Sequence, residues 1–118
     1  MDNISKKERD KINRYLTLDV DELYAMIPPF LPEYKTTLFA PPGMILAGKK
    51  YYEEIYVSLR KVICEDFNWP EKRKNPKFND NIELIATISD AITAYIGGMP
   101  SFIIATIIVK MKLDDLCK

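Results

Sequence analysis

Apolar residues recur at intervals of three and four along most of this chain, the spacing that puts them on one face of an α-helix. About five segments show this spacing, two of them short and N-terminal and three longer, and turn-forming residues separate them. The pattern predicts an all-α fold in which residues 1–118 form a single helical domain. We expect a compact bundle with two long apolar-rich loops that ends in a C-terminal helical hairpin.

The first predicted helix spans about residues 6–15. Ser5 precedes Glu8 by the spacing of a capping box, in which the hydroxyl accepts from the Glu8 backbone N–H and the carboxylate reaches back. The apolar side chains lie towards the end of this helix, at Ile12, Tyr15 and Leu16. We therefore expect the helix to dock by its C-terminal end, in preference to acting as an exposed recognition arm.

The second predicted helix spans about residues 20–27. Asp19 and Glu22 repeat the capping-box spacing, and acidic residues in the first turn suit the helix dipole. Pro28 and Pro29 end the helix, because proline lacks an N–H and disfavours helical geometry in the residue before it.

Residues 28–42 form the first long loop, rich in proline and large apolar side chains. Two roles are open. The favoured role is a cover over the helix bundle, because a monomer rarely exposes so many large apolar groups. The alternative is a docking loop for a partner. Its candidate docking residues are Phe30, Tyr34 and Phe39.

The longest predicted helix begins between residues 44 and 49 and ends at 66 or 67. Glu53 and Glu54 lie side by side on its charged side, where they point about 100° apart and cannot readily serve one acid/base or metal site. We expect a solvated face there. The predicted apolar face consists of Ala47, Tyr51, Ile55, Leu59, Val62, Ile63 and Phe67.

Residues 67–79 form the second long loop and hold the one marked cluster of positive charge. Cations interleaved with aromatic rings can bind a phosphate group or single-stranded nucleic acid. We favour the alternative, a solvated loop with Trp69 and Phe78 turned inward. The residues of this candidate anion-binding loop are Trp69, Lys72, Arg73, Lys74 and Lys77.

The C-terminal pair of helices is predicted at residues 82–96 and 101–116. Asp80 and Glu83 have the capping-box spacing, and Gly97 and Gly98 suit a left-handed helix exit. Pro100 suits the start of the next helix. The apolar face predicted for the first helix of the pair consists of Leu84, Ile85, Ile88, Ala91, Ile92, Tyr95 and Ile96.

The last predicted helix is apolar on nearly every side, which indicates that it is surrounded. It is therefore the central helix, part of an oligomer interface, or a lipid contact. The candidate partner or self-association surface consists of Phe102, Ile103, Ile104, Ile107 and Ile108. Asp114 and Asp115 fall in its last turn, where the dipole disfavours acidic residues, so a basic partner, a cation or plain exposure is expected.

The composition excludes several classes of function, and no motif indicates a particular one. The chain has 17 basic and 17 acidic residues, a balance that removes the global field expected of a nucleic-acid binder. It has no histidine, which excludes Ser-His-Asp and Cys-His catalysis and most zinc sites. No nucleotide-binding or metalloprotease motif occurs, so we expect no catalytic residue, no metal and no cofactor.

The two cysteines, Cys64 and Cys117, lie in apolar helical contexts. The chain opens with polar residues in place of a signal peptide, so a cytoplasmic location is expected. In that compartment the thiols are predicted to be free and reduced.

These observations predict a small cytosolic, non-enzymatic interaction module: an accessory, adaptor, immunity or regulatory protein. Its partner is expected to be a protein, including a second copy of the chain in a homo-oligomer. A membrane-associating hairpin at residues 82–116 is a less favoured alternative. A nucleic-acid or nucleotide binder that uses the basic loop 69–78 is less favoured still.

Overall fold

The computed structural model describes residues 4–31, 41–97 and 99–117, and every regular element among them is helical. The all-α prediction is confirmed. The principal helices are α1 (Lys6–Leu16), α2 (Val20–Ala25), α3 (Pro41–Lys61), α5 (Asn81–Tyr95) and α6 (Ser101–Lys110). Shorter elements are η1 (Pro28–Phe30), the π-helical η3 (Val62–Asp66), α4 (Trp69–Lys72), η4 (Pro76–Asn79) and α7 (Leu113–Leu116).

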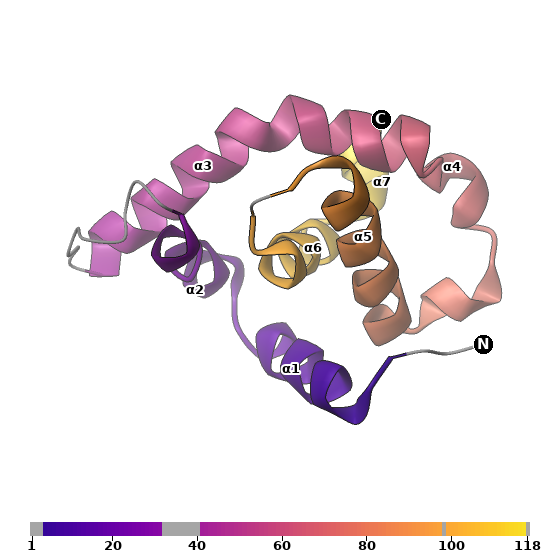
Figure 1. Cartoon of the computed structure of the whole chain (residues 1–118), viewed down its shortest axis with the longest axis horizontal. Helices are drawn as coiled ribbons and strands as arrows, with labels where there is room; N and C mark the ends of the chain where they lie inside the picture. Colours follow the sequence, from indigo (N-terminus) through magenta and orange to yellow (C-terminus); the bar gives the residue numbers. More distant parts are fainter. Residues whose placement is uncertain (1–3, 32–40, 98, 118) are drawn as a thin grey trace.

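Helix α6 lies at the centre of the molecule (Figure 1). It packs against α5, and α1 and α2 also contact it, while α3 runs along the opposite side of the fold from α1. The whole stretch 103–108 is buried, including Thr106, whose hydroxyl donates to the Phe102 carbonyl at 2.7 Å. The last helix was predicted to be the central helix, part of an oligomer interface, or a lipid contact. In the structure α6 is the central helix, and the other helices cover it.

The first two predicted capping boxes are present. The Ser5 hydroxyl accepts from the Glu8 backbone N–H at 3.1 Å, and the Glu8 carboxylate accepts from the Ser5 N–H at 3.3 Å. Asp19 and Glu22 make the same pair of bonds at 2.8 and 3.0 Å. Local hydrogen bonding between residues three apart therefore fixes where α1 and α2 begin.

The ends of α5 differ from the prediction. Asp80 does cap the helix, but its carboxylate accepts from the Ile82 N–H at 2.9 Å, closer along the chain than the Glu83 N–H of a capping box. At the other end the chain leaves through Ile96 in an extended conformation, and Gly97 is not left-handed. Gly98 lies outside the described residues.

Helix α3 begins earlier than predicted, at Pro41 in place of residues 44–49. Proline is well suited to a first helical position, because its missing N–H would have no partner there. The helix continues into the π-helical turn η3, where the Phe67 N–H donates to the Val62 carbonyl at 2.7 Å. The predicted end at residue 66 or 67 is confirmed.

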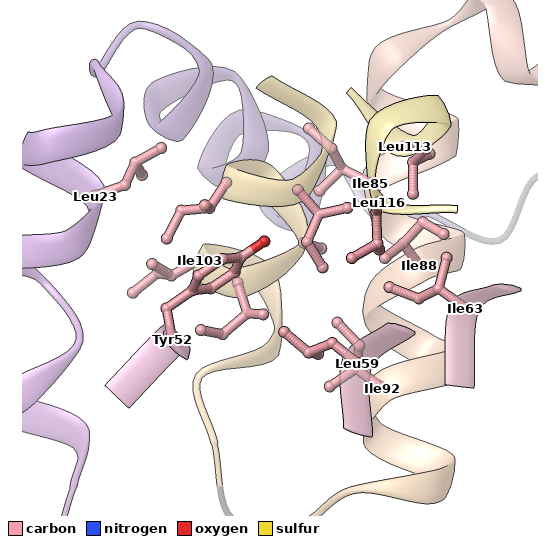
Figure 2. Close-up of a cluster of buried hydrophobic side chains, with 14 of the residues drawn as sticks. Leu23, Tyr52, Leu59, Ile63, Ile85, Ile88, Ile92, Ile103, Leu113 and Leu116 are labelled. Atoms are coloured by element: carbon pink, nitrogen blue, oxygen red, sulfur yellow. The ribbon is translucent and has the colours of Figure 1, made fainter. Parts of the chain in front are cut away.

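The buried faces of α3 and α5 are rotated slightly from the predicted ones. Tyr52 is 5% exposed and enters the core (Figure 2), whereas its neighbour Tyr51 is half-buried. On α5, Ser89 is buried and Tyr95 is 60% exposed, so the prediction of an inward Tyr95 is wrong. In the core, side chains of α3 and α5 meet others from α2, η3, α6 and α7. The residues labelled in Figure 2 are Leu23, Tyr52, Leu59, Ile63, Ile85, Ile88, Ile92, Ile103, Leu113 and Leu116.

The final helix is broken, whereas a continuous helix over residues 101–116 was predicted. Helix α6 ends at Lys110, and Lys112 has φ 73°, a conformation that an L-residue rarely adopts. The short α7 then starts a new turn, so Asp114 and Asp115 fall in its first turn, where the helix dipole favours acidic residues.

The structure describes the second predicted long loop throughout but the first only in part. Residues 32–40 of the first loop lie outside the described residues, so its covering role has no test. The second loop is not irregular: it contains α4 and η4. Its Trp69 and Phe78 are both buried, as the favoured interpretation required, and their ring centroids lie 5.9 Å apart.

A disulfide joins Cys64 of η3 to Cys117 beside α7, so the prediction of free, reduced thiols is wrong. The two Cα atoms lie 5.4 Å apart although the residues are 53 positions apart in the chain. The sequence placed both cysteines in helical, apolar surroundings. The folding back of α7 onto η3 brings the two sulfurs together.

Candidate functional site: a tyrosine-lined groove beside the C-terminal segment

A small groove lies where α3 meets the end of α6 and α7. Its volume is about 70 Å³. Small-molecule sites usually enclose about 300 Å³ or more, so this groove is smaller than a typical ligand pocket and has room for about one side chain. The residues that line it are Tyr52, Tyr56, Ile108, Met111, Lys112, Asp115 and Leu116, and we call it the tyrosine groove.

Tyr52 and Tyr56, which line the tyrosine groove, belong to a row of three tyrosines. Tyr24 of α2 and Tyr52 of α3 have ring centroids 5.8 Å apart, and Tyr52 and Tyr56 follow at 6.2 Å in an edge-to-face arrangement. The Tyr24 hydroxyl donates to the Met111 sulfur at 3.6 Å, which ties the row to the end of α6. Edge-to-face aromatic pairs and sulfur contacts stabilise such a row without making it polar.

The rim of the tyrosine groove exposes apolar and aromatic surface. Tyr56 is 39% exposed and Met111 is 45% exposed, while Val57, next along α3, is 79% exposed. The floor is sealed, because Ile108 and Leu116 belong to the core. Tyrosine and methionine are enriched in protein–protein interfaces, where they supply large contact areas at modest entropic cost.

Charge around the tyrosine groove has both signs, with Lys112 and Asp115 exposed among its lining residues. Burial is the main factor that raises the pKa of Tyr52 well above its ordinary value. Burial likewise raises the pKa of Tyr24, and the carboxylates of Glu53 and Asp21 raise it further. These two phenols are therefore protonated at neutral pH and can donate hydrogen bonds, but they are poor bases.

Trp69 and Arg73 of the candidate anion-binding loop make hydrogen bonds within the protein. The Trp69 indole Nε1–H donates to Asp114 Oδ1 at 3.0 Å, and Arg73 Nη1 donates to the same oxygen at 3.2 Å. These two hydrogen bonds are the main reason that the pKa of Asp114 is lowered. A basic partner was one of the expectations for Asp114, and Arg73 is that partner.

The other cations of this loop also have neighbours close by. Lys74 Nζ lies 3.2 Å from Glu71 Oε2. The Lys72 ammonium lies 5.5 Å from the centroid of the Phe67 ring, and the Lys77 ammonium lies 5.1 Å from that of Phe78. Exposed cations can still exchange such contacts for a phosphate. Binding of an anion by this loop remains an untested prediction.

The candidate self-association residues of α6 mostly face the chain's own core. Phe102 is half-buried, and the Lys11 ammonium lies 5.5 Å from its ring centroid. A contact between copies of the folded chain would therefore need side chains other than the four buried isoleucines. Those four, at 0–1% exposure, are Ile103, Ile104, Ile107 and Ile108.

The candidate docking loop is described at only one of its three residues. Phe30 is 54% exposed and borders a shallow hollow that Tyr15 and Phe102 also line. Tyr34 and Phe39 lie outside the described residues. Phe30 is thus available to a partner, but the loop as a whole is untested.

Sequence reasoning did not find the tyrosine groove. Tyr52 and Tyr56 are four apart and so share a helix face, which is a usable signal, but Tyr51 and Ile55 have the same spacing one residue earlier. Met111 and Lys112 were placed inside a continuous helix. Their role at the rim depends on the break between α6 and α7, for which the local sequence gives no glycine or proline signal.

Two further findings concern the described residues. None of their helices combines the length and the apolar composition that crossing a bilayer requires. Their cysteine, aspartate and glutamate side chains nowhere gather in a group of three able to hold a metal ion. No protein-family model, no curated protein and no solved structure matches this chain.

Proposed function

We propose that this protein is a small, non-enzymatic interaction module that binds another protein through the tyrosine groove. The observation that carries the proposal is the exposure of Tyr56 and Met111 around a sealed apolar floor. Accessory, adaptor, immunity and regulatory roles are all compatible with such a module.

The size and chemistry of the tyrosine groove suggest the kind of partner. A volume of about 70 Å³ suits one apolar side chain as an anchor. Lys112 and Asp115 can pair with charges of either sign on the segment that flanks the anchor. The partner is therefore a protein segment with one apolar residue among charged ones.

We place this module in the cytosol, as predicted from the sequence. The Cys64–Cys117 disulfide then has a consequence for its redox state. Disulfides in that compartment are mostly transient, since its thiols keep cysteines reduced. A cytosolic module of this fold would therefore alternate between its oxidised and reduced forms.

The test compares two tyrosine truncations. A partner is captured from the native host with the wild-type chain, produced in pure form, and titrated against each variant by calorimetry. Tyr56→Ala should raise Kd by roughly 30-fold, the effect of losing a hot-spot side chain worth about 2 kcal/mol.

Tyr95→Ala is the matched control, because Tyr95 is also exposed but lies on α5, outside the tyrosine groove. Its Kd should equal that of the wild type. Equal binding by wild type and Tyr56→Ala, or a loss only with Tyr95→Ala, would remove the tyrosine groove as the binding site.

A further inference from the structure

A second hollow, of about 230 Å³, lies beside the C-terminal segment. It is lined by Trp69, Pro70, Arg73, Asp114 and Cys117. Both half-cystines are partly exposed, and Cys117 contributes to the wall of this hollow. The disulfide is thus approachable from solvent without unfolding of the core.

We propose that the Cys64–Cys117 disulfide is a reversible latch, which a small thiol opens by entering this hollow. Opening releases α7 from η3. The effect on partner binding rests on the function proposed above, because Leu116 of α7 is also part of the tyrosine groove.

Besides the disulfide, two buried leucines and several hydrogen bonds hold the latched segment. Helix α7 has 4 residues, too few to be stable as an isolated helix. Leu113 and Leu116 are its buried residues. Its polar ties include the hydrogen bonds from Trp69 and Arg73 to Asp114 and one at 3.2 Å from Arg60 Nε to the Leu116 carbonyl. The bond from Arg73 is exposed and the other two are partly buried, and a single hydrogen bond adds only modest net stability because the same groups bond to water in the released segment.

The connection to α6 is suited to movement. Lys112 joins the two helices with φ 73°, in the region where an L-side chain is strained. Release of α7 lets Lys112 relax, while the buried stretch 103–108 of α6 keeps its packing. Detachment of the segment after Lys112 takes Leu113 and Leu116 out of the core, while stretch 103–108 stays packed against α1, α2 and α5.

The chemistry is thiol–disulfide exchange. A thiolate attacks the Cys117 sulfur, forms a mixed disulfide, and displaces Cys64 as a thiolate that takes up a proton. A second thiol attacks the outer sulfur of the mixed disulfide and frees Cys117, which is protonated in turn. The protein disulfide gains two electrons and two protons, and the two small thiols become one disulfide.

Opening of the latch should change the tyrosine groove. Leu116 precedes Cys117 directly and closes the groove floor together with Ile108. When α7 leaves, the Tyr52 side of the groove gains exposed apolar surface. The redox state then determines which shape a partner meets.

The test uses hydrogen exchange of the native chain with and without a small thiol, together with the fluorescence of Trp69, the only tryptophan. Reduction should remove amide protection in residues 113–117 while α5 and α6 keep theirs. The Trp69 emission should move to longer wavelength, since the indole loses its bond to Asp114 and meets water.

The control is the double variant Cys64→Ser/Cys117→Ser, which should show the open pattern without reductant and no response to added thiol. Three results would overturn the latch: unchanged protection of α7 after reduction, loss of protection in all helices together, or reduction only after the chain has unfolded. None of these readouts involves a partner, so the latch and the binding function can fail separately.

Discussion

At the residue scale, α2 and α3 approach each other closely at Gly48 of α3. A Cβ atom at this position would overlap the backbone carbonyl of Tyr24 in α2. The missing side chain therefore sets how near α2 and α3 can lie. It also sets the place of the tyrosine row, because Tyr24 and Tyr52 face each other across this contact.

Substitution of Gly48 by alanine should destabilise the fold. The overlapped atom is backbone and cannot move aside as a flexible side chain would, so α2 and α3 must separate. We expect Gly48→Ala to lower the free energy of unfolding by about 1–3 kcal/mol, measured by urea denaturation. Gly97→Ala is the control, because a Cβ there meets no atom within 4 Å, and it should change stability by under ~1 kcal/mol. Equal effects of the two substitutions would contradict this assignment.

Tyr52 illustrates what a sequence pattern leaves undecided at this scale. Tyr51 and Tyr52 are chemically identical, and each belongs to a run of apolar residues at helical spacing. The contact with Tyr24 and the close approach at Gly48 determine which of them is buried. Both contacts come from α2, so the choice depends on a partner helix distant in sequence.

At the element scale, Asp114 is the main polar link between α7 and the α4 region. The hydrogen bonds from Trp69 and Arg73 lower its pKa below the ordinary value of 3.8. Because the folded pKa is lowered, the stabilisation is fully present above pH 3.8 and is lost as the pH falls through the folded value.

This linkage predicts a pH effect on the docking of α7. Acidification from neutral pH through the folded pKa of Asp114, which lies below 3.8, should weaken the Trp69–Asp114 bond and shift the Trp69 emission to longer wavelength. Asp114→Asn should abolish this titration, because the amide does not ionise. Asp115→Asn is the control, since the neighbouring carboxylate accepts neither bond, and it should keep the wild-type curve. A wild-type curve in Asp114→Asn would contradict the assignment.

Local signals predicted the starts of the elements better than their interruptions. The Ser5–Glu8 and Asp19–Glu22 pairs placed the starts of α1 and α2 because both partners of each bond lie in one turn. The break at Lys112 was missed. It depends on α7 folding back to bury Leu113 and Leu116, which involves residues far along the chain.

At the scale of the whole molecule, α6 is the element that the others surround. Its buried face includes Ile104 and Ile107 at 0% exposure, and α5, α1 and α2 all contact this helix. The same side chains were candidates for self-association. Their energetic role separates the two interpretations: a core residue stabilises each chain, whereas an interface residue stabilises the oligomer.

Truncation of Ile104 should therefore destabilise the monomeric fold. We expect Ile104→Ala to lower the free energy of unfolding by about 2–5 kcal/mol, the range for cavities in well-packed cores. The loss should be the same at low and high protein concentration. Val57→Ala is the surface control, at 79% exposure, and should cost under about 0.5 kcal/mol. A loss that grows on dilution would place Ile104 in an interface between chains.

The sequence by itself determined the helical class, the approximate ranges of the main helices and the need to surround the apolar stretch after Pro100. These follow from residue spacing and from hydrogen bonds within one turn, both of which are local. Only the tertiary structure decided which face of α3 is buried, where the last helix breaks, that Cys64 meets Cys117, and where a tyrosine groove forms. Each of these depends on contacts between segments distant in the chain, and helical periodicity does not encode which segments meet.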